Sequence, residues 1–294
     1  MDSQNLTAFL AVAQTASFSL AGEQLHLTQP AISKRIAMLE SQLGVRLFDR
    51  VGRTVTLTEA GQVLIKRAQR ILRDIDDTRQ ALSNLSGKVS GRLSIATSHH
   101  IGLHRLPPIL QCFNQQYPEV SLDIRFVDSE WAYGGVRRGE IELGIITIAP
   151  EYLTKKQSDR FITREIWHDD LVFMVAKTHS LASLSHPSLD AISQHPAVFP
   201  GKNTFTRSIV QSHFEQSGLS LDVIMESNYL ETLKMMVSIG LAWSVLPRTM
   251  LTEGMVEITP KNMSMSRSLG YVHHQDRTLS NAGQVLIDLL EQQR

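Results

Sequence analysis

The segment that decides the fold lies near the N-terminus and spans residues 27–50. It reads LTQPAISKRIAMLESQLGVRLFDR, and its first half repeats large apolar residues at spacings of four and three, as on one helix face. Thr28 belongs to the residue types that cap helix N-termini, and Pro30 fits the first turn, where its missing N–H costs nothing. The pattern predicts a helix from Thr28 to about Leu43.

Patterns on both sides extend this helix into a domain. A shorter helix is predicted at residues 19–25, and two short helices with a tight turn are typical of a helix-turn-helix. Apolar and polar residues alternate in residues 46–50 and 54–58, as in the two strands of a hairpin. Such a hairpin would form a wing. We therefore predict a winged helix-turn-helix DNA-binding domain over residues 1–58.

A long helix should follow as a linker over residues 59–87. One face of this helix carries residues spaced alternately by four and three positions, as in a coiled-coil dimer. We call this face the seam, and it comprises Leu64, Ala68, Ile71, Ile75, Thr78, Leu82 and Leu85. Thr78 interrupts the apolar seam, and a helix that packs on its own domain is the alternative. Two glycines then bracket a short polar run, which predicts a hinge at residues 88–92.

The remainder, residues 93–294, alternates strand-like and helix-like stretches, which predicts an α/β domain with a parallel sheet. One helix is expected between the first strand and Gln116. We expect two lobes, the first formed by residues 93–163 and 268–294 and the second by residues 164–267. The predicted fold class is thus α/β multidomain, with a winged helix-turn-helix and a two-lobed C-terminal domain.

The charge is unevenly distributed along the chain. Its 294 residues carry no net charge, but residues 1–92 contain 12 Lys and Arg against 8 Asp and Glu. A basic end suits contact with the phosphates of DNA.

We expect a cytoplasmic protein. The sequence shows no apparent secretory signal, and its longest apolar stretch, residues 235–247, is shorter than the roughly 20 residues that a membrane span needs. The single cysteine, Cys112, is predicted to be a buried, inert thiol.

Several runs closely resemble the LysR-type transcriptional regulators. The strongest are Leu-Thr-Gln-Pro-Ala-Ile-Ser-Lys at 27–34, Leu-Gly-Val-Arg-Leu-Phe-Asp-Arg at 43–50 and Leu-Thr-Glu-Ala-Gly at 57–61. Weaker matches, such as Gly-Leu-Ala-Trp-Ser-Val-Leu-Pro at 240–247, extend the resemblance over the whole chain. The resemblance implies a bacterial regulator that binds promoter DNA and a small effector. It also implies two lobes like those of periplasmic binding proteins, dimerisation through the linker helix and a homotetramer.

The predicted DNA contacts come from the helix at 28–43 and from the wing. Polar side chains in the first half of that helix can face one way, where Gln can pair with adenine and Lys with guanine or phosphate. A solvated helix face is the alternative interpretation. The resemblance places DNA contacts on this face and in the wing, at Thr28, Gln29, Pro30, Ser33, Lys34 and Arg53.

The effector is expected where strands end and helices begin, because unpaired backbone N–H groups there favour anions. The resemblance carries effector contacts over to Ser98, His100, Ser129, Thr147, Pro200 and Gly201. His100 departs from the small hydroxyl residue more typical of the family. It could pair with a carboxylate as an imidazolium, or stay neutral and donate one hydrogen bond. We hypothesise a small carboxylate or amino-acid-like effector, with an anionic metabolite suspected.

Other classes of function fit the sequence less well. The adjacent histidines 99–100 and 273–274 point apart on a strand, and no cysteine or carboxylate stands at a recognised ligand spacing, so neither a metal nor a cofactor is expected. An enzyme should show a nucleophile motif or a phosphate loop, and the chain shows neither. A two-lobed solute-binding protein would have an export signal and no basic N-terminal segment.

Overall fold

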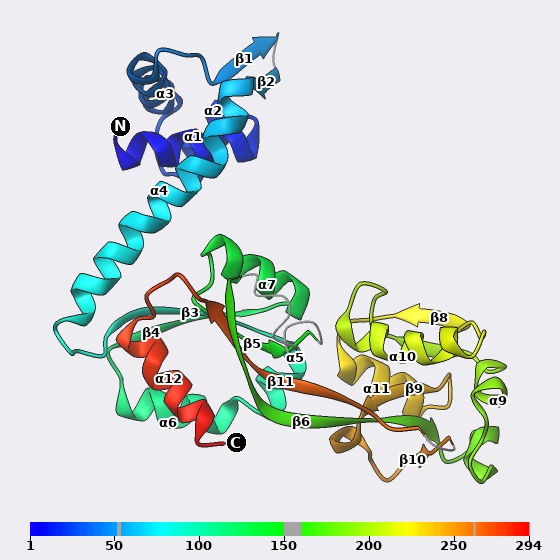
Figure 1. The fold of residues 1–294 in the computed structure, drawn as a ribbon. Coiled ribbons are helices and arrows are strands. Elements are labelled where there is room, and N and C mark those ends of the chain that lie inside the picture. The colour runs from blue at the N-terminus through cyan, green and yellow to red at the C-terminus, as the bar shows by residue number, and fades with distance from the viewer. Residues whose placement is uncertain (52–53, 150–159, 261–262, 294) are drawn as a thin grey trace. The chain divides into compact units, whose positions relative to one another are not determined.

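The computed structural model describes residues 1–51, 54–149, 160–260 and 263–293 (Figure 1). The chain forms two compact units, Met1–Ser86 and Gly87–Arg294. The first unit contains α1 (Ser3–Thr15), α2 (Phe18–Gln24), α3 (Gln29–Leu43), β1 (Phe48–Val51), β2 (Thr54–Leu57) and α4 (Glu59–Asn84).

A tight turn joins α2 to α3. His26 adopts a positive φ of 54°, and the N–H of Leu27 donates to the carbonyl oxygen of Gly22 at 2.8 Å. A Cβ atom on Gly22 would lie 2.7 Å from the Leu27 oxygen, which is closer than real Cβ contacts allow. The turn therefore requires glycine at position 22. Two short helices joined in this way form the predicted helix-turn-helix.

The core of this unit forms where α1, α2 and α3 meet β1. Ile32, Ile36 and Leu39 of α3 are buried in it, as their spacing predicts. The ring of Phe48 in β1 lies 5.4 Å from that of Phe9 and 5.9 Å from that of Phe18. β1 and β2 pair antiparallel as the hairpin of the predicted wing.

The long helix α4 packs on its own domain over its first half only. The Thr58 hydroxyl caps its first turn and accepts from the N–H of Gly61 at 3.0 Å. Leu64 and Ala68 are buried in the core of the first unit, so this half packs on its own domain. Leu82 and Leu85 are 64% and 82% exposed, which leaves the second half of the seam open.

The second unit is built on one seven-stranded sheet in the order β10-β6-β11-β5-β3-β4, with β9 also paired to β6. Its strands and helices are β3 (Gly91–Thr97), α5 (His99–His104), α6 (Pro107–Gln116), β4 (Val120–Phe126), α7 (Ser129–Arg138), β5 (Leu143–Thr147), β6 (Phe161–Ala176), α9 (Leu189–Ser193), β7 (Ala197–Phe199), α10 (Phe205–Gln216), β8 (Val223–Glu226), α11 (Leu230–Ser238), β9 (Ser244–Pro247), β10 (Met255–Ile258), β11 (Met265–His274) and α12 (Asn281–Glu291). Two short 3-10 helices lie at Ser180–Ser183 and Arg248–Met250.

Two lobes share this sheet. In the first, α6 and α12 cover one sheet face and α7 covers the other, each over its own apolar cluster (Figure 1). The second lobe has separate cores around Trp243 and around α11. The long strands β6 and β11 pair along their length and pass through both lobes. The predicted lobe boundaries at 163/164 and 267/268 fall inside these two strands.

The structure corrects two predictions for this unit. The large sheet is mixed: β3 pairs parallel with β4 and β5, whereas β6 and β11 pair antiparallel. Alternation of strands and helices cannot reveal such long strands between lobes. The single helix predicted before Gln116 is two helices, α5 and α6. Pro107 begins α6 and disfavours helical backbone at Leu106, which separates them.

Candidate functional site

The predicted DNA-contacting residues of the first unit lie together at the start of α3. Thr28 is the N-cap residue, although its hydroxyl makes no capping hydrogen bond. Gln29, Pro30 and Lys34 are exposed, Ser33 is half-buried, and the Gln29 amide donates to the Ser33 hydroxyl at 2.9 Å. These side chains are accessible beside the buried apolar residues of α3, and we call them the polar outer face. Arg53 lies outside the described residues.

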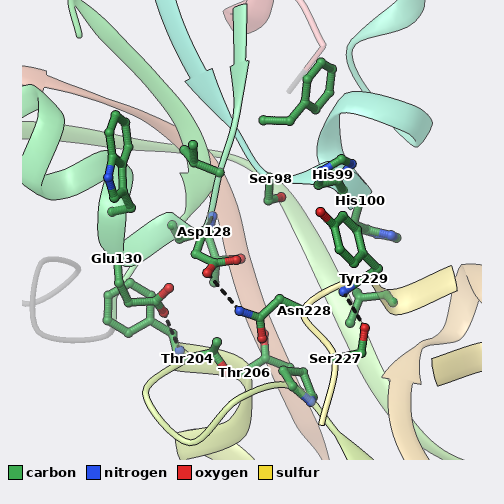
Figure 2. Close-up of a pocket in the computed structure, with 18 of the residues that line it drawn as sticks. Ser98, His99, His100, Asp128, Glu130, Thr204, Thr206, Ser227, Asn228 and Tyr229 are labelled. Carbon is green, nitrogen blue, oxygen red and sulfur yellow. Dashed lines mark hydrogen bonds between the residues drawn. The ribbon is translucent and has the colours of Figure 1, made fainter. Parts of the chain in front are cut away.

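The second unit contains a cavity of about 580 Å³ between its two lobes (Figure 2). Its walls come from the C-terminal ends of strands and the N-terminal ends of α5, α7 and α10. The lining residues are Ser98, His99, His100, Phe126, Val127, Asp128, Ser129, Glu130, Trp131, Thr147, Pro200, Thr204, Phe205, Thr206, Glu226, Ser227, Asn228, Tyr229, Leu230 and Arg267. This volume is in the usual range for small-molecule sites.

Most of the predicted effector residues meet at this cavity. Ser98, His100, Ser129, Thr147 and Pro200 line it, and Ser98 and Ser129 lie at the N-terminal ends of α5 and α7. The Ser129 hydroxyl accepts from the N–H of Thr147 at 3.1 Å, which joins α7 to β5. Gly201 does not line the cavity. Its N–H donates to the side-chain oxygen of Asn228 at 2.9 Å, so it supports a lining residue from behind.

A buried ion pair forms one end of the cavity. Arg267 of β11 lies directly opposite Asp169 of β6 in the strand register. Its Nε donates to Asp169 at 2.8 Å, and its Nη1 donates to the Thr206 hydroxyl at 2.9 Å. Arg105 lies 3.8 Å from the other oxygen of Asp169. Two guanidinium groups therefore share one carboxylate, which leaves this end with one excess positive charge.

His100 lies beside this ion pair and is neutral. Burial, together with the charges of Arg267, His104 and Arg105, lowers the pKa of His100 from 6.5 to about 3. Its Nε2 is 3.9 Å from an oxygen of Asp169, but neither ring nitrogen forms a hydrogen bond within the described part of the chain. Of the two states that the sequence leaves open, the structure favours the neutral imidazole, which can donate one hydrogen bond.

Three polar contacts cross the cleft between the lobes. The Asn228 amide donates to Asp128 at 2.8 Å, and the N–H of Phe205 donates to Glu130 at 2.6 Å, both drawn in Figure 2. Outside the cavity lining, His104 contacts Glu231 of α11 at 2.7 Å, and the His104 ring lies 4.9 Å from that of His100. These contacts hold α5 and α7 of the first lobe against the second.

Sequence reasoning missed several residues of the cavity. Arg267 belongs to β11, in which buried residues alternate from Met265 through Arg267 to Leu269. That period of two is the signal that could have revealed it. The segment at 227–229 supplies a loop whose approach to Asp128 depends on tertiary packing. Nothing in the sequence pattern signals that approach.

The remaining predictions concern metals, membranes and Cys112. Among the described residues, no cluster of three or more His, Cys, Asp or Glu could hold a metal ion. Within the same part of the chain, every helix is too short or too polar to span a membrane. Cys112 is half-buried on α6 rather than buried, and its sulfur accepts a hydrogen bond from the Gln116 amide at 3.0 Å.

A helix-turn-helix with a polar outer face, joined to a two-lobed domain with a polar cavity, defines a class of ligand-responsive DNA-binding proteins. Residues 3–62 match the family described as bacterial regulatory helix-turn-helix protein, lysR family, and residues 86–294 match the LysR substrate binding domain. The chain belongs to the LysR family of transcriptional regulators.

Curated relatives are named as transcriptional regulators rather than as enzymes. A regulator of Azotobacter vinelandii, from the ibpB-leuC intergenic region, is 71% identical over 108 residues, which are 37% of this chain and 75% of the relative. YfeR of Shigella flexneri is 28% identical over 99% of this chain and 93% of its own. The activator CmpR of Synechocystis is 27% identical over 96% and 92%.

Solved structures share the whole fold. Full-length OxyR from Pseudomonas aeruginosa superposes with a TM-score of 0.70 at 22% identity, covering 99% of this chain and 94% of its own. Full-length CbnR, in a complex with its target DNA, gives a TM-score of 0.63 at 19% identity, and both chains are fully covered. These likenesses confirm the predicted fold class.

Proposed function

We propose that this protein binds specific promoter sequences through α3 and that a small molecule in the cavity between the lobes modulates its activity. The observation that carries the proposal is the polar outer face at the start of α3, held on a buried apolar face within a helix-turn-helix. The CbnR neighbour, whose structure contains target DNA, supports this role.

Each residue of the outer face has a chemical role in this proposal. Gln29 pairs with adenine, and Lys34 contacts guanine or phosphate, because these side chains match the groups displayed in the major groove. Thr28, Pro30 and Ser33 complete the contact surface. Arg53 in the wing contacts phosphate or the minor groove, which adds affinity with little sequence preference.

In the second unit, the effector binds at Ser98, His100, Ser129, Thr147, Pro200 and the backbone near Gly201. We propose a small carboxylate or amino-acid-like metabolite, because the cavity offers hydroxyl groups, a neutral imidazole and a buried guanidinium. The contacts across the cleft depend on how the lobes approach each other. An effector that binds one arrangement of the two lobes more tightly than another would shift the protein between two states.

The proposed assembly is a homodimer through α4 that pairs further into a homotetramer, in the bacterial cytoplasm. The exposed Leu82 and Leu85 continue the apolar seam of α4 and would be covered by a second copy. A dimer with two-fold symmetry would read two half-sites about 34 to 36 Å apart, one turn of DNA.

Selection of genomic fragments by the purified full-length protein tests this function. We expect recovery of a few fragments that share a two-fold symmetric sequence and lie upstream of genes. Gel shifts on one recovered fragment should weaken steeply as salt rises, because phosphate contacts release counterions. Recovery of random fragments would contradict the proposal. A solute-binding protein or an enzyme without a DNA role would give that result.

A further inference from the structure

The cavity lining carries charges of both signs. Among the described lining residues, three carboxylates (Asp128, Glu130 and Glu226) stand against one guanidinium, that of Arg267. Glu226 interacts electrostatically with the buried Arg207 outside the lining. Asp128 and Glu130 form no ion pair with a Lys, Arg or His anywhere in the described part of the chain. We call these two residues the acidic end of the cavity.

The two carboxylates of the acidic end affect each other. Burial raises the pKa of Glu130, and the charge of Asp128 raises it further. Asp128 is the N-cap residue of α7, yet its carboxylate makes no capping hydrogen bond and is directed toward the cavity, where it accepts from Asn228 (Figure 2). A cation bound near both carboxylates would relieve their repulsion.

The opposite charge is found where Arg267 and Arg105 share Asp169. We call this group, with His100, the basic end. Both arginines lower the pKa of His100, which reflects a positive potential there. The His100 ring is only 4% exposed, lines the cavity and has no hydrogen bond to the described chain. A buried polar ring without a partner costs free energy unless a ligand supplies one.

Aromatic rings also line the cavity. The His99 ring lies 5.2 Å from that of Phe126 and 4.5 Å from that of Tyr229. Phe126 and Tyr229 are 48% and 54% exposed, so their surfaces are accessible to a ligand. Such a wall suits an apolar or aromatic group of the ligand.

We propose that the effector is a zwitterion, an α-amino acid with an apolar or aromatic side chain. Its ammonium group binds at Asp128 and Glu130, and its carboxylate binds beside Arg267, neutral His100 and the Thr206 hydroxyl. The two groups share one carbon, which fits this site because the adjacent residues Phe205 and Thr206 contact Glu130 and Arg267 respectively. A ligand with two carboxylates would bring one of them toward Asp128 and Glu130, and like charges repel there. This inference rests on the proposed function, in which this cavity holds the effector.

Calorimetric titration of the full-length protein with matched compounds tests the proposal. The probes are the standard L-amino acids, their 2-hydroxy acids, in which a hydroxyl replaces the ammonium group, their decarboxylated amines, and small dicarboxylates. We expect at least one amino acid to bind. Its hydroxy acid and its amine should each bind about tenfold more weakly or worse, because each loses a charge-assisted contact.

Charge-neutral variants sharpen the test. Asp128→Asn and Glu130→Gln keep acceptor oxygens for Asn228 and Phe205, so the lobes remain bridged. Each should lower affinity for the amino acid about tenfold and leave affinity for the hydroxy acid unchanged or improved. Glu140→Gln is the matched control, because Glu140 follows α7 outside the cavity and pairs with Arg138. A purely structural role at Asp128 or Glu130 would weaken both ligands equally, which overturns the proposal.

Two other results would also overturn it. One is tighter binding of hydroxy acids or dicarboxylates than of any amino acid, and the other is no binding by any amino acid. The proposed function is judged separately by DNA selection. Specific DNA binding without amino-acid binding would remove this inference alone, whereas loss of specific DNA binding would remove the proposed function.

Discussion

The outer face of α3 and the cavity between the lobes hold their polar residues in opposite environments. On α3, Gln29 and Ser33 are one helical turn apart and the neighbouring polar residues are largely exposed. In the cavity, His100, Arg267 and Asp169 come from three elements and are buried. A substitution on α3 should therefore change binding with little effect on stability. A substitution at the basic end of the cavity should change stability itself.

The largest expected effect follows from Asp169→Leu. Because this change leaves the Arg267 guanidinium buried without its main partner, we expect a loss of about 3 to 5 kcal/mol in the free energy of unfolding. Denaturant titration of the full-length protein measures it. The control is Asp170→Leu at the neighbouring exposed position, expected within about 0.5 kcal/mol of wild type. Equal losses in the two variants would contradict a structural role for the buried pair.

The next effect concerns the turn of the helix-turn-helix. Gly22→Ala places a Cβ atom 2.7 Å from the Leu27 carbonyl oxygen, so we expect a loss of about 1 to 3 kcal/mol in stability and weaker operator binding. Gly254→Ala, with no atom within 4 Å of its Cβ position, is the control for thermal unfolding. Unchanged stability in Gly22→Ala would show that the turn relaxes freely.

Substitutions on α3 separate binding from stability. Gln29→Ala and Ser33→Ala should each weaken specific operator binding by about 1 to 3 kcal/mol while stability stays within about 0.5 kcal/mol. Arg53→Ala should weaken binding to most sequences and reduce its salt dependence. Gel-shift titrations at two salt concentrations measure both effects. No change in any of the three variants would refute the assignment of α3 and the wing.

The smallest effect is a pH dependence due to His100. Since its pKa is about 3 in the folded protein and 6.5 when unfolded, the unfolded chain binds one more proton between these values. Stability should therefore fall as pH drops below 6.5, with about 1.4 kcal/mol lost by pH 5.5 through this residue. Denaturant titrations should show a smaller loss in His100→Asn than in wild type. His168→Asn, whose ring is 62% exposed, should behave like wild type.

The same contrast explains what the sequence could predict. The face of α3 is local, so the spacing of residues within one helix defines it. Strand ends indicated where the effector site lies, because residues after parallel strands meet at one sheet edge, and the family resemblance picked out Ser98, His100, Ser129 and Thr147 there. Arg267, Asp169 and Asn228 were missed because their roles arise from the pairing of β6 with β11 and from the approach of one lobe to the other.

The affinity of the full-length protein for a selected genomic fragment, compared with a scrambled fragment of equal length at physiological salt, tests the central claim most directly. The account predicts a preference of about 10³-fold or more, because base contacts by α3 add to the phosphate contacts common to both fragments. Equal affinity for the two fragments would contradict it.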